Sequence, residues 1–192
     1  MRHLITIGFL ALAAPALAET WEIDPAHSNV QFSVRHMMIS NVRGQFTKVA
    51  GTVHSEDGDV TRSSIEATID AASVDTREPK RDEHLRGPDF LDVGRYPRIT
   101  FRSKRVEKAG DGHYKVVGDL TLHGVTREVA LDVEGPSPPM KDPRGAVHAG
   151  AQATARINRQ DFGISWSKAL DGGGVMVGDE VAITIDVEGV RK

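Results

Sequence analysis

The stretch VHAGAQATARI (residues 147–157) alternates between apolar, mostly small side chains and polar ones, with Gly150 as the exception on the polar face. A period of two is the pattern of a β-strand with one buried face, because successive side chains of a strand point to opposite sides. The segment therefore predicts a half-buried strand whose inner face has little bulk. That face carries Ala149, Ala151, Ala153 and Ala155.

The same period recurs along the chain. HSNVQFSVRHM (27–37) sets Val30, Phe32 and Val34 on one face and polar residues on the other. Turn-forming stretches rich in Gly and Asp separate such segments, which is typical of antiparallel sheets with one wet face. About eight strands are predicted in this way. The other alternating segments are 43–54, 65–71, 99–102, 114–122, 128–133 and 181–188.

One short segment, 77–90, has a helical pattern, and Gly87-Pro88 ends it. The proline-rich stretch 135–145 is interpreted as a loop or sheet corner, since alternation resumes after it. One short helix cannot cover a sheet of eight strands, so the strands must bury their apolar faces against each other. We predict an all-β fold, an antiparallel eight-stranded barrel with one short helical segment.

The predicted inner face is short of bulk. Beside the four alanines of 147–157 it carries Ala67, Ala71 and Gly118. An eight-stranded barrel can be filled by side chains or can hold one small ligand. Since interiors pack to a density of about 0.75, either the barrel flattens into a sandwich or the space is occupied. The residues alone leave both outcomes open.

Residues 1–18 combine a short basic start, an apolar run and small residues at Ala16 and Ala18. This pattern is typical of a cleaved signal peptide, which predicts export to the periplasm. Residues 19–192 then form a single domain. The net charge of −3 shows no basic excess, so nucleic acid is not an expected partner. The chain has no cysteine, which says little about compartment for a domain of this size.

Catalytic and metal motifs are weak. The eight histidines are scattered without metal-ligand spacing, so no metal site is predicted. DPAHS (24–28) holds Asp24, His27 and Ser28, but a turn followed by a strand is the better interpretation. No catalytic residue is predicted.

For three segments the sequence allows two interpretations, packing in the core or on the surface, and lining a cavity. RDEHLRGPDF (81–90) is a solvated helical turn, or it caps one barrel end and tucks Phe90 and Leu91 inward. His36 with Met37, Met38 and Ile39 fills core or lines a cavity mouth. Trp166 plugs the core or stands at the rim.

Several motifs together resemble the YceI-like, polyisoprenoid-binding family of exported proteins. Their order and spacing, from Trp21 to about Glu188, carry the resemblance. The motifs are W-x-I-D-x-x-H-S (21–28), F-x-V-R-H (32–36), V-R-G-Q-F (42–46), R-D-E-H-L (81–85), D-F-L-D-V (89–93), Y-P-x-I-T-F-x-S (96–103), G-D-L-T-L-H-G-V-T (118–126), I-N-R-Q-D-F-G-I (157–164) and V-G-D-E-V (177–181).

The resemblance implies a lipocalin-like barrel with an internal apolar tunnel and a non-covalently held isoprenoid lipid. It implies no catalytic set and no catalytic cofactor. The chain departs from the family at Gly87-Pro88, where serine is common, and at Leu91, where a second aromatic is common, which bears on the tail rather than the fold.

The candidate ligand-binding residues come from the inward faces of the strands, and from Phe90 and Trp166 in the segments that could close a barrel end. His36, with Arg35 at the rim, is the candidate for the lipid head group. The expected function is binding, and transport or storage, of a long-chain isoprenoid. The alternative functions are a factor or enzyme acting on the head group of a lipid or quinone, and a ligand-free structural or interaction domain. A homodimer, and a transient contact with a membrane or a membrane protein, are possible partner interactions. The twelve candidates are Val30, Phe32, Val34, His36, Phe46, Phe90, Phe101, Leu120, Leu122, Leu131, Phe162 and Trp166.

Overall fold

The computed structural model describes residues 18–56 and 59–192. The signal-peptide prediction therefore falls almost entirely outside the described residues, as does the centre of the turn predicted at 56–59. Within the described part, no helix is long and apolar enough to cross a membrane.

Most of the described residues are in strands. The elements are β1 (Ala18–Ile23), β2 (Asn29–His36), β3 (Ser40–Phe46), β4 (Val49–Glu56), β5 (Asp59–Asp70), β6 (Val74–Asp75), α1 (Pro79–Arg86), β7 (Arg98–Gly110), β8 (His113–Leu122), β9 (Val125–Glu134), β10 (Met140–Lys141), β11 (Val147–Asn158) and β12 (Val177–Arg191), with short 3₁₀ turns at Ala71–Ser73 and Arg159–Phe162.

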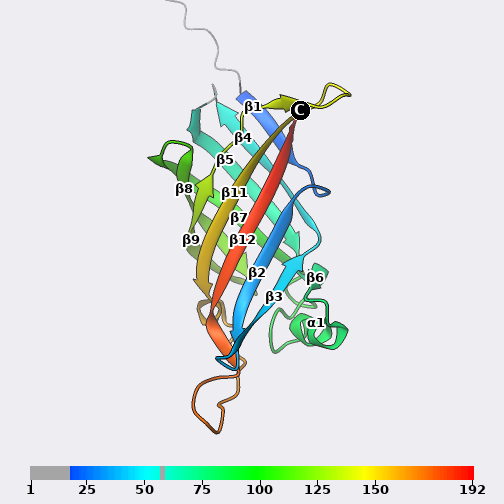
Figure 1. Ribbon diagram of the computed structural model, residues 1–192, viewed down its shortest axis with the longest axis vertical. Helices are drawn as coiled ribbons and strands as arrows, with labels where there is room; N and C mark the ends of the chain where they lie inside the picture. Colours follow the sequence, from blue (N-terminus) through cyan, green and yellow to red (C-terminus); the bar gives the residue numbers. More distant parts are fainter. Residues whose placement is uncertain (1–17, 57–58) are drawn as a thin grey trace, which may run out of the picture.

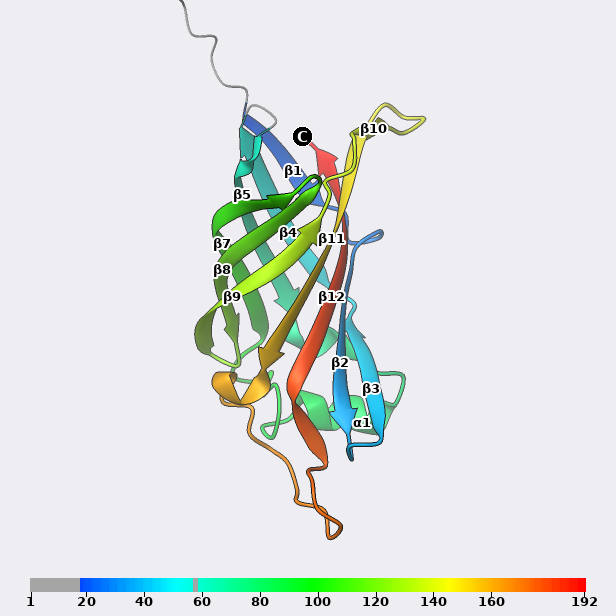
Figure 2. The ribbon, with the colours of Figure 1, turned by 60° about the vertical axis from the view of Figure 1, so that its left-hand side comes forward.

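The sheet closes on itself because β11 pairs with β12. β1 and β2 both lie along one edge of β12, and they pair with β4 and β3 respectively. In the same way, β5 pairs with β4 and β6 pairs with β3, so β5 and β6 lie along the edge formed by β4 and β3. β1 and β2 thus share one position in the barrel, as do β3 and β4, and β5 and β6. Counting each shared position once, together with β7, β8, β9, β11 and β12, gives the closed eight-stranded antiparallel barrel that the sequence predicts, an elongated tube in Figures 1 and 2.

Two boundaries differ from the prediction. The segment 43–54 is two strands, β3 and β4, because the ladder changes partner from β2 to β1 between them. β6 and β10, with two residues each, are too short to show an alternation. The turn DPAHS separates β1 from β2 and lies opposite the break between β3 and β4.

The helix is shorter than the predicted segment 77–90. The Glu78 side chain accepts a hydrogen bond from the Lys80 N–H, Pro79 occupies the first turn, and Gly87 follows the last residue. The helix lies beside the barrel end that also carries the β2–β3 turn (Figure 2), and we call this end the α1 end. The opposite end, where β1 begins and β12 ends, is the terminus end.

The packed core lies at the α1 end. The last residues of β8 and β11 and the first of β7 meet the segments 87–97 and 159–164 there. Its buried members are Ala71, Phe90, Ile99, Leu122, Ile157, Phe162 and Ile164. Between this core and the terminus end, the inward side chains surround a cavity.

Candidate functional site

The barrel encloses a cavity of about 810 Å³, within the range of cavities that bind small organic ligands. On β12 the lining runs from Val177 at the α1 end to Gly189 near the terminus end. At about 3.3 Å per residue this stretch is roughly 40 Å long. The cavity is thus long and narrow, and side chains from every one of the eight barrel positions line it.

The small residues of the inner face leave this space. Ala67, Ala149, Ala151, Ala153 and Ala155 all line the cavity. The chain therefore forms a hollow barrel and does not flatten into a sandwich around its alanines. The other two small residues of the predicted inner face do not line the cavity. Ala71 is buried in the packed core, and Gly118 lies beneath the ring of Phe101.

Most of the candidate residues line the cavity, both those predicted from strand parity and Phe90 and Trp166, which lie outside the strands. Eleven of the twelve line the cavity: Val30, Phe32, Val34, His36, Phe46, Phe90, Phe101, Leu120, Leu122, Leu131 and Trp166.

Phe162 is the exception. It is only 1% exposed and lies in the packed core at the α1 end rather than on the cavity surface. The physical reason is its position in the 3₁₀ turn Arg159–Phe162, where strand parity no longer applies. The prediction of Phe162 as a wall residue is therefore corrected to a core residue that supports the cavity floor.

The wall seats its aromatic rings against glycines on the neighbouring strand. A Cβ at Gly44 would lie 2.5 Å from Cζ of Phe32, and one at Gly118 would lie 2.6 Å from Cζ of Phe101. Phe32 also packs on Phe46, with ring centroids 5.7 Å apart. The rings lie flat along the wall and do not fill the barrel, so the interior stays open.

Three rings close the cavity at the α1 end. His84 from α1 contacts Phe90 and Trp166 edge-on, with ring centroids 5.0 and 5.1 Å away, and Phe90 lies 5.2 Å from Trp166. His84 Nε2 is 2.8 Å from the carboxylate of Asp89, which holds its ring in place. The segment 81–91 therefore caps this end and tucks Phe90 and Leu91 inward, and Trp166 is part of the plug.

Basic side chains border the same end of the cavity. Arg81 donates to the hydroxyl and carbonyl of Thr76, and Arg35 donates to the Met38 carbonyl, while both also line the cavity. His36 lies on the cavity wall beside them, where it was expected as a head-group candidate.

Arg159 was not anticipated as part of this end. Its side chain is 4% exposed, and the guanidinium donates to the carbonyls of Ile164, Trp166, Val177 and Gly178. It also forms an ion pair with Asp179 at 3.1 Å, and burial lowers its pKa while that carboxylate opposes the shift. The alternation of Ala155 and Ile157 only indicates that the chain enters this turn facing inward, and it does not give the partners of Arg159, which lie at residues 164–179.

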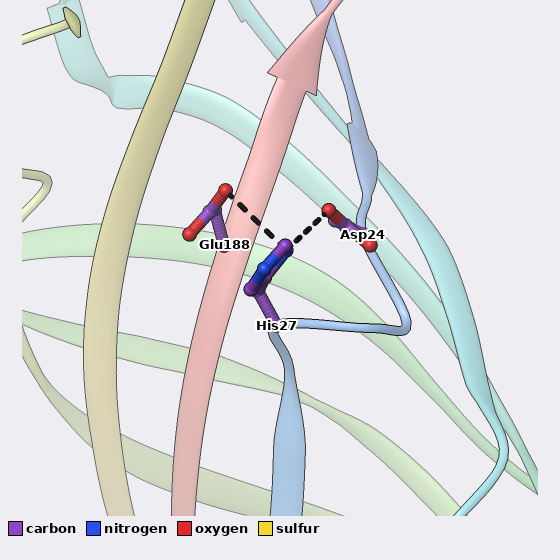
Figure 3. A group of neighbouring side chains, drawn as sticks. All are labelled: Asp24, His27 and Glu188. Carbon is purple, nitrogen blue, oxygen red and sulfur yellow. Dashed lines mark hydrogen bonds and ion pairs between the residues drawn. The ribbon is translucent and has the colours of Figure 1, made fainter. Parts of the chain in front are cut away.

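A polar group lies on the outer face of the barrel, where the β1–β2 turn crosses β12 (Figure 3). His27 Nδ1 is 2.8 Å from Asp24 and 3.9 Å from Glu188, and His148 Nδ1 is 2.7 Å from the same Glu188 oxygen. The hydrogen bond from His27 lowers the pKa of the Asp24 carboxyl, and the same bond raises the pKa of the His27 imidazole. Sequence reasoning missed this group because Glu188 is far from the turn along the chain.

This outer group fastens the turn and does not form a nucleophilic triad. The Ser28 hydroxyl pairs with the backbone of Glu188, donating to its carbonyl and accepting from its N–H, rather than with His27. Asp24, His27 and Glu188 bring ligand atoms within 4.8 Å of one another, but the hydrogen bonds already made explain their arrangement. They hold the break between β1 and β2 against β12.

The model of the YceI-like domain matches residues 21–189, nearly the whole barrel. The chain belongs to the YceI-like family. A UPF0312 protein of Staphylococcus aureus (strain MSSA476) is 36% identical over 165 residues, which cover 86% of this chain and 94% of that protein. A UPF0312 protein of Vibrio cholerae (strain ATCC 39541 / Classical Ogawa 395 / O395) is 34% identical over 191 residues, covering 98% and 94%.

Solved structures share this YceI-like barrel. BcnA of Burkholderia cenocepacia has a TM-score of 0.73 at 26% identity and covers 86% of this chain and 98% of its own. The YCEI protein of Campylobacter jejuni has a TM-score of 0.69 at 30% identity, covering 82% and 90%. A polyisoprenoid binding domain of Saccharophagus degradans has the same fold at 16% identity and a TM-score of 0.64, covering 90% and 98%.

Proposed function

We propose that this protein binds a long-chain isoprenoid lipid, of the quinone or polyprenyl type, and carries or stores it in the periplasm. The observation that supports this most is the cavity, because about 810 Å³ of space lined by aliphatic and aromatic side chains is an unfavourable void when it is empty. A guest would restore dispersion contacts and remove its own apolar surface from water, at about 0.8 kcal/mol per buried CH₂ group.

The shape of the cavity favours a chain-like guest. A lining that follows β12 for roughly 40 Å accommodates an extended tail better than a compact ring system. At the α1 end, His36, Arg35 and Arg81 offer hydrogen-bond donors to a polar head. The Saccharophagus domain with this fold is named for polyisoprenoid binding, which agrees with the proposal.

Native mass spectrometry of the protein purified from its own host tests the proposal. We expect a mass excess that solvent extraction releases as a long-chain isoprenoid, and the same spectrum gives the subunit count and so reports on a homodimer. Fractionation of the host cells tests the periplasmic location. Lipid-free protein that also takes up no added isoprenoid would contradict binding.

A matched pair of variants locates the binding to the cavity. Ala151→Phe places a ring in the narrow interior, whereas Gln152→Phe places the same ring on the outer face of the same strand. We expect Ala151→Phe to retain at least about tenfold less lipid, since it removes the space for several CH₂ groups, and Gln152→Phe to retain the wild-type amount. Equal retention by both would place the lipid outside the barrel.

A further inference from the structure

The large apolar side chains that the described residues expose gather at one end. Met37, Met38, Ile39 and Val175 are 39%, 51%, 74% and 37% exposed. They form a surface at the α1 end that we call the apolar tip. The remaining exposed large apolar residue, Met140, is at the terminus end.

The apolar tip is built from two loops that are hydrogen-bonded to each other. Met37 in the β2–β3 turn donates to the carbonyl of Met176 at 2.8 Å, and Met176 donates to Lys168 at 2.8 Å. A bridge between Ala169 and Val175 narrows the second loop into a finger. Figures 1 and 2 show both loops projecting beyond the barrel at the α1 end.

The turn carries side chains that its backbone does not favour. Met37 and Met38 have φ values of 50° and 62°, and the turn is closed by a hydrogen bond from Ile39 N to His36 O. Turns with positive φ at both central residues prefer Asn and Gly, because other side chains clash with the backbone there. Two exposed methionines at these positions indicate that the side chains themselves are used, and methionine adapts to varied apolar partners.

The apolar tip borders the end of the cavity. His36, which precedes the turn, and Met176, which follows the finger, both line the cavity, and so does Trp166 at the base of the finger. A partner surface that covers the apolar tip therefore also lies against the α1 end of the cavity.

The charges beside the tip suit an anionic surface. Arg35, which donates to the Met38 carbonyl, and Lys168 are exposed, and neither has a carboxylate partner among the described residues. Asp171 is the acidic residue on the finger. A second protein copy fits poorly, because a stable interface needs about 20–30 residues a side and the tip offers four side chains on two narrow loops. A lipid surface accepts such side chains individually.

We propose that the apolar tip docks on a lipid bilayer and places the α1 end of the cavity against it, so that an apolar chain passes between bilayer and barrel when the rings of His84, Phe90 and Trp166 that close this end move aside. Met37, Met38, Ile39 and Val175 enter the acyl boundary, while Arg35 and Lys168 remain among the phosphate groups. Transfer of the chain rests on the proposed function, whereas docking does not.

Vesicle flotation tests the docking step. The full-length mature protein is mixed with vesicles of phosphatidylcholine alone and of equimolar phosphatidylcholine and phosphatidylglycerol. We expect binding to both, stronger with phosphatidylglycerol, and a loss of at least about tenfold in the double variant Met38→Ser/Ile39→Ser. Met140→Ser, which removes a more exposed methionine at the other end, should bind like wild type. Val175→Ser is the second tip variant and should also weaken binding.

The contrary outcomes are distinct. No flotation of the wild type, or an equal loss in Met140→Ser, overturns the docking proposal. Loss of binding in Arg35→Gln/Lys168→Gln but not in the serine variants would show adsorption by charge alone and overturns it as well. A dimer in light scattering that the serine variants dissociate, without vesicle binding, would assign the tip to self-association. Native mass spectra of the serine variants should still show the bound lipid. A wild-type protein that floats with vesicles but holds no lipid would refute the proposed function and leave docking standing.

Discussion

At the scale of single residues, the openness of the barrel depends on where its rings lie. Phe32 and Phe101 are large enough to project across a narrow interior, yet each packs over a glycine of the adjacent strand, Gly44 or Gly118. Glycine in a strand is unfavourable for backbone entropy and frequently marks a close approach of this kind. The glycines thus keep the rings on the wall.

Substituting Gly118 by alanine tests this packing. The new Cβ would meet the Arg102 carbonyl oxygen, and it would lie 2.8 Å from the Ser103 Cα, so backbone atoms have to move. We expect Gly118→Ala to lower the free energy of unfolding by about 1–3 kcal/mol in urea denaturation. Gly94→Ala is the control, since nothing lies within 4 Å of its Cβ position, and it should change stability by less than about 0.5 kcal/mol. Similar losses in both would contradict the close approach.

Arg159 is the residue whose removal the α1 end should tolerate least. Arg159→Met leaves four carbonyl acceptors of the floor without their donor, and it leaves Asp179 without its partner. We expect a loss of about 3–5 kcal/mol in the free energy of unfolding, by urea denaturation. Arg156→Met, on β11 just before the turn that carries Arg159, removes only an exposed ion pair with Glu180 and should cost about 0.2–1 kcal/mol. A small effect at Arg159 would mean that the loop 163–167 holds itself.

At the scale of elements, the barrel contains breaks that need fastening. β1 and β2 share one edge of β12, and the turn between them is held by Asp24, His27 and Glu188 on the outer face. The backbone also contributes, because Asp24 N donates to the Glu188 carbonyl at 2.8 Å. Ion pairing at this joint makes the barrel's stability depend on pH.

The pH dependence has a definite sign. The pKa of His27 is raised above 6.5 in the folded state, so its contribution is complete below pH 6.5 and is lost as pH rises through the raised value. The pKa of Asp24 is lowered below 3.8, so its contribution is present above pH 3.8 and is lost as pH falls through the lowered value. Both contribute between these limits.

Thermal melts of His27→Gln test the joint. We expect the difference in Tm between wild type and variant to be largest near about pH 5 and to shrink towards about pH 8, because wild-type His27 loses its proton. His113→Gln is the control, since this exposed histidine is bonded to a backbone oxygen and not to a carboxylate. A difference in Tm that does not vary with pH would show that the imidazole acts through packing alone.

At the scale of the whole molecule, the chain divides its interior into a packed floor and a hollow shaft. The floor gathers Phe90, Ile99, Leu122, Phe162 and Ile164 at the α1 end. The shaft above it is walled by alanines on β11 and by flat-lying rings. Lipid retention is tested at this scale because it needs the shaft to be open. Vesicle docking is tested at this scale because it needs two separate loops to lie at one end of the barrel.

The sequence predicts the strands and their inner faces well, because parity is a local property. Phe101 and Leu120, for example, lie on the cavity wall as their alternation indicates. The prediction failed at Phe162, where the strand has ended and parity no longer says which way a ring points. It also failed at β6 and β10, which are too short to alternate.

By itself the sequence determined the all-β class and the side of each strand that faces inward, since these follow from a period of two. It favoured closure into a barrel, because the strands need to bury one face. Only the tertiary structure decided that the alanine face borders an open cavity rather than a flattened core. It also decided that Arg159 clamps the floor, that Glu188 meets His27 and that two apolar loops project together. These features depend on distances between segments far apart in the chain, which are set when the barrel closes and which no local pattern encodes.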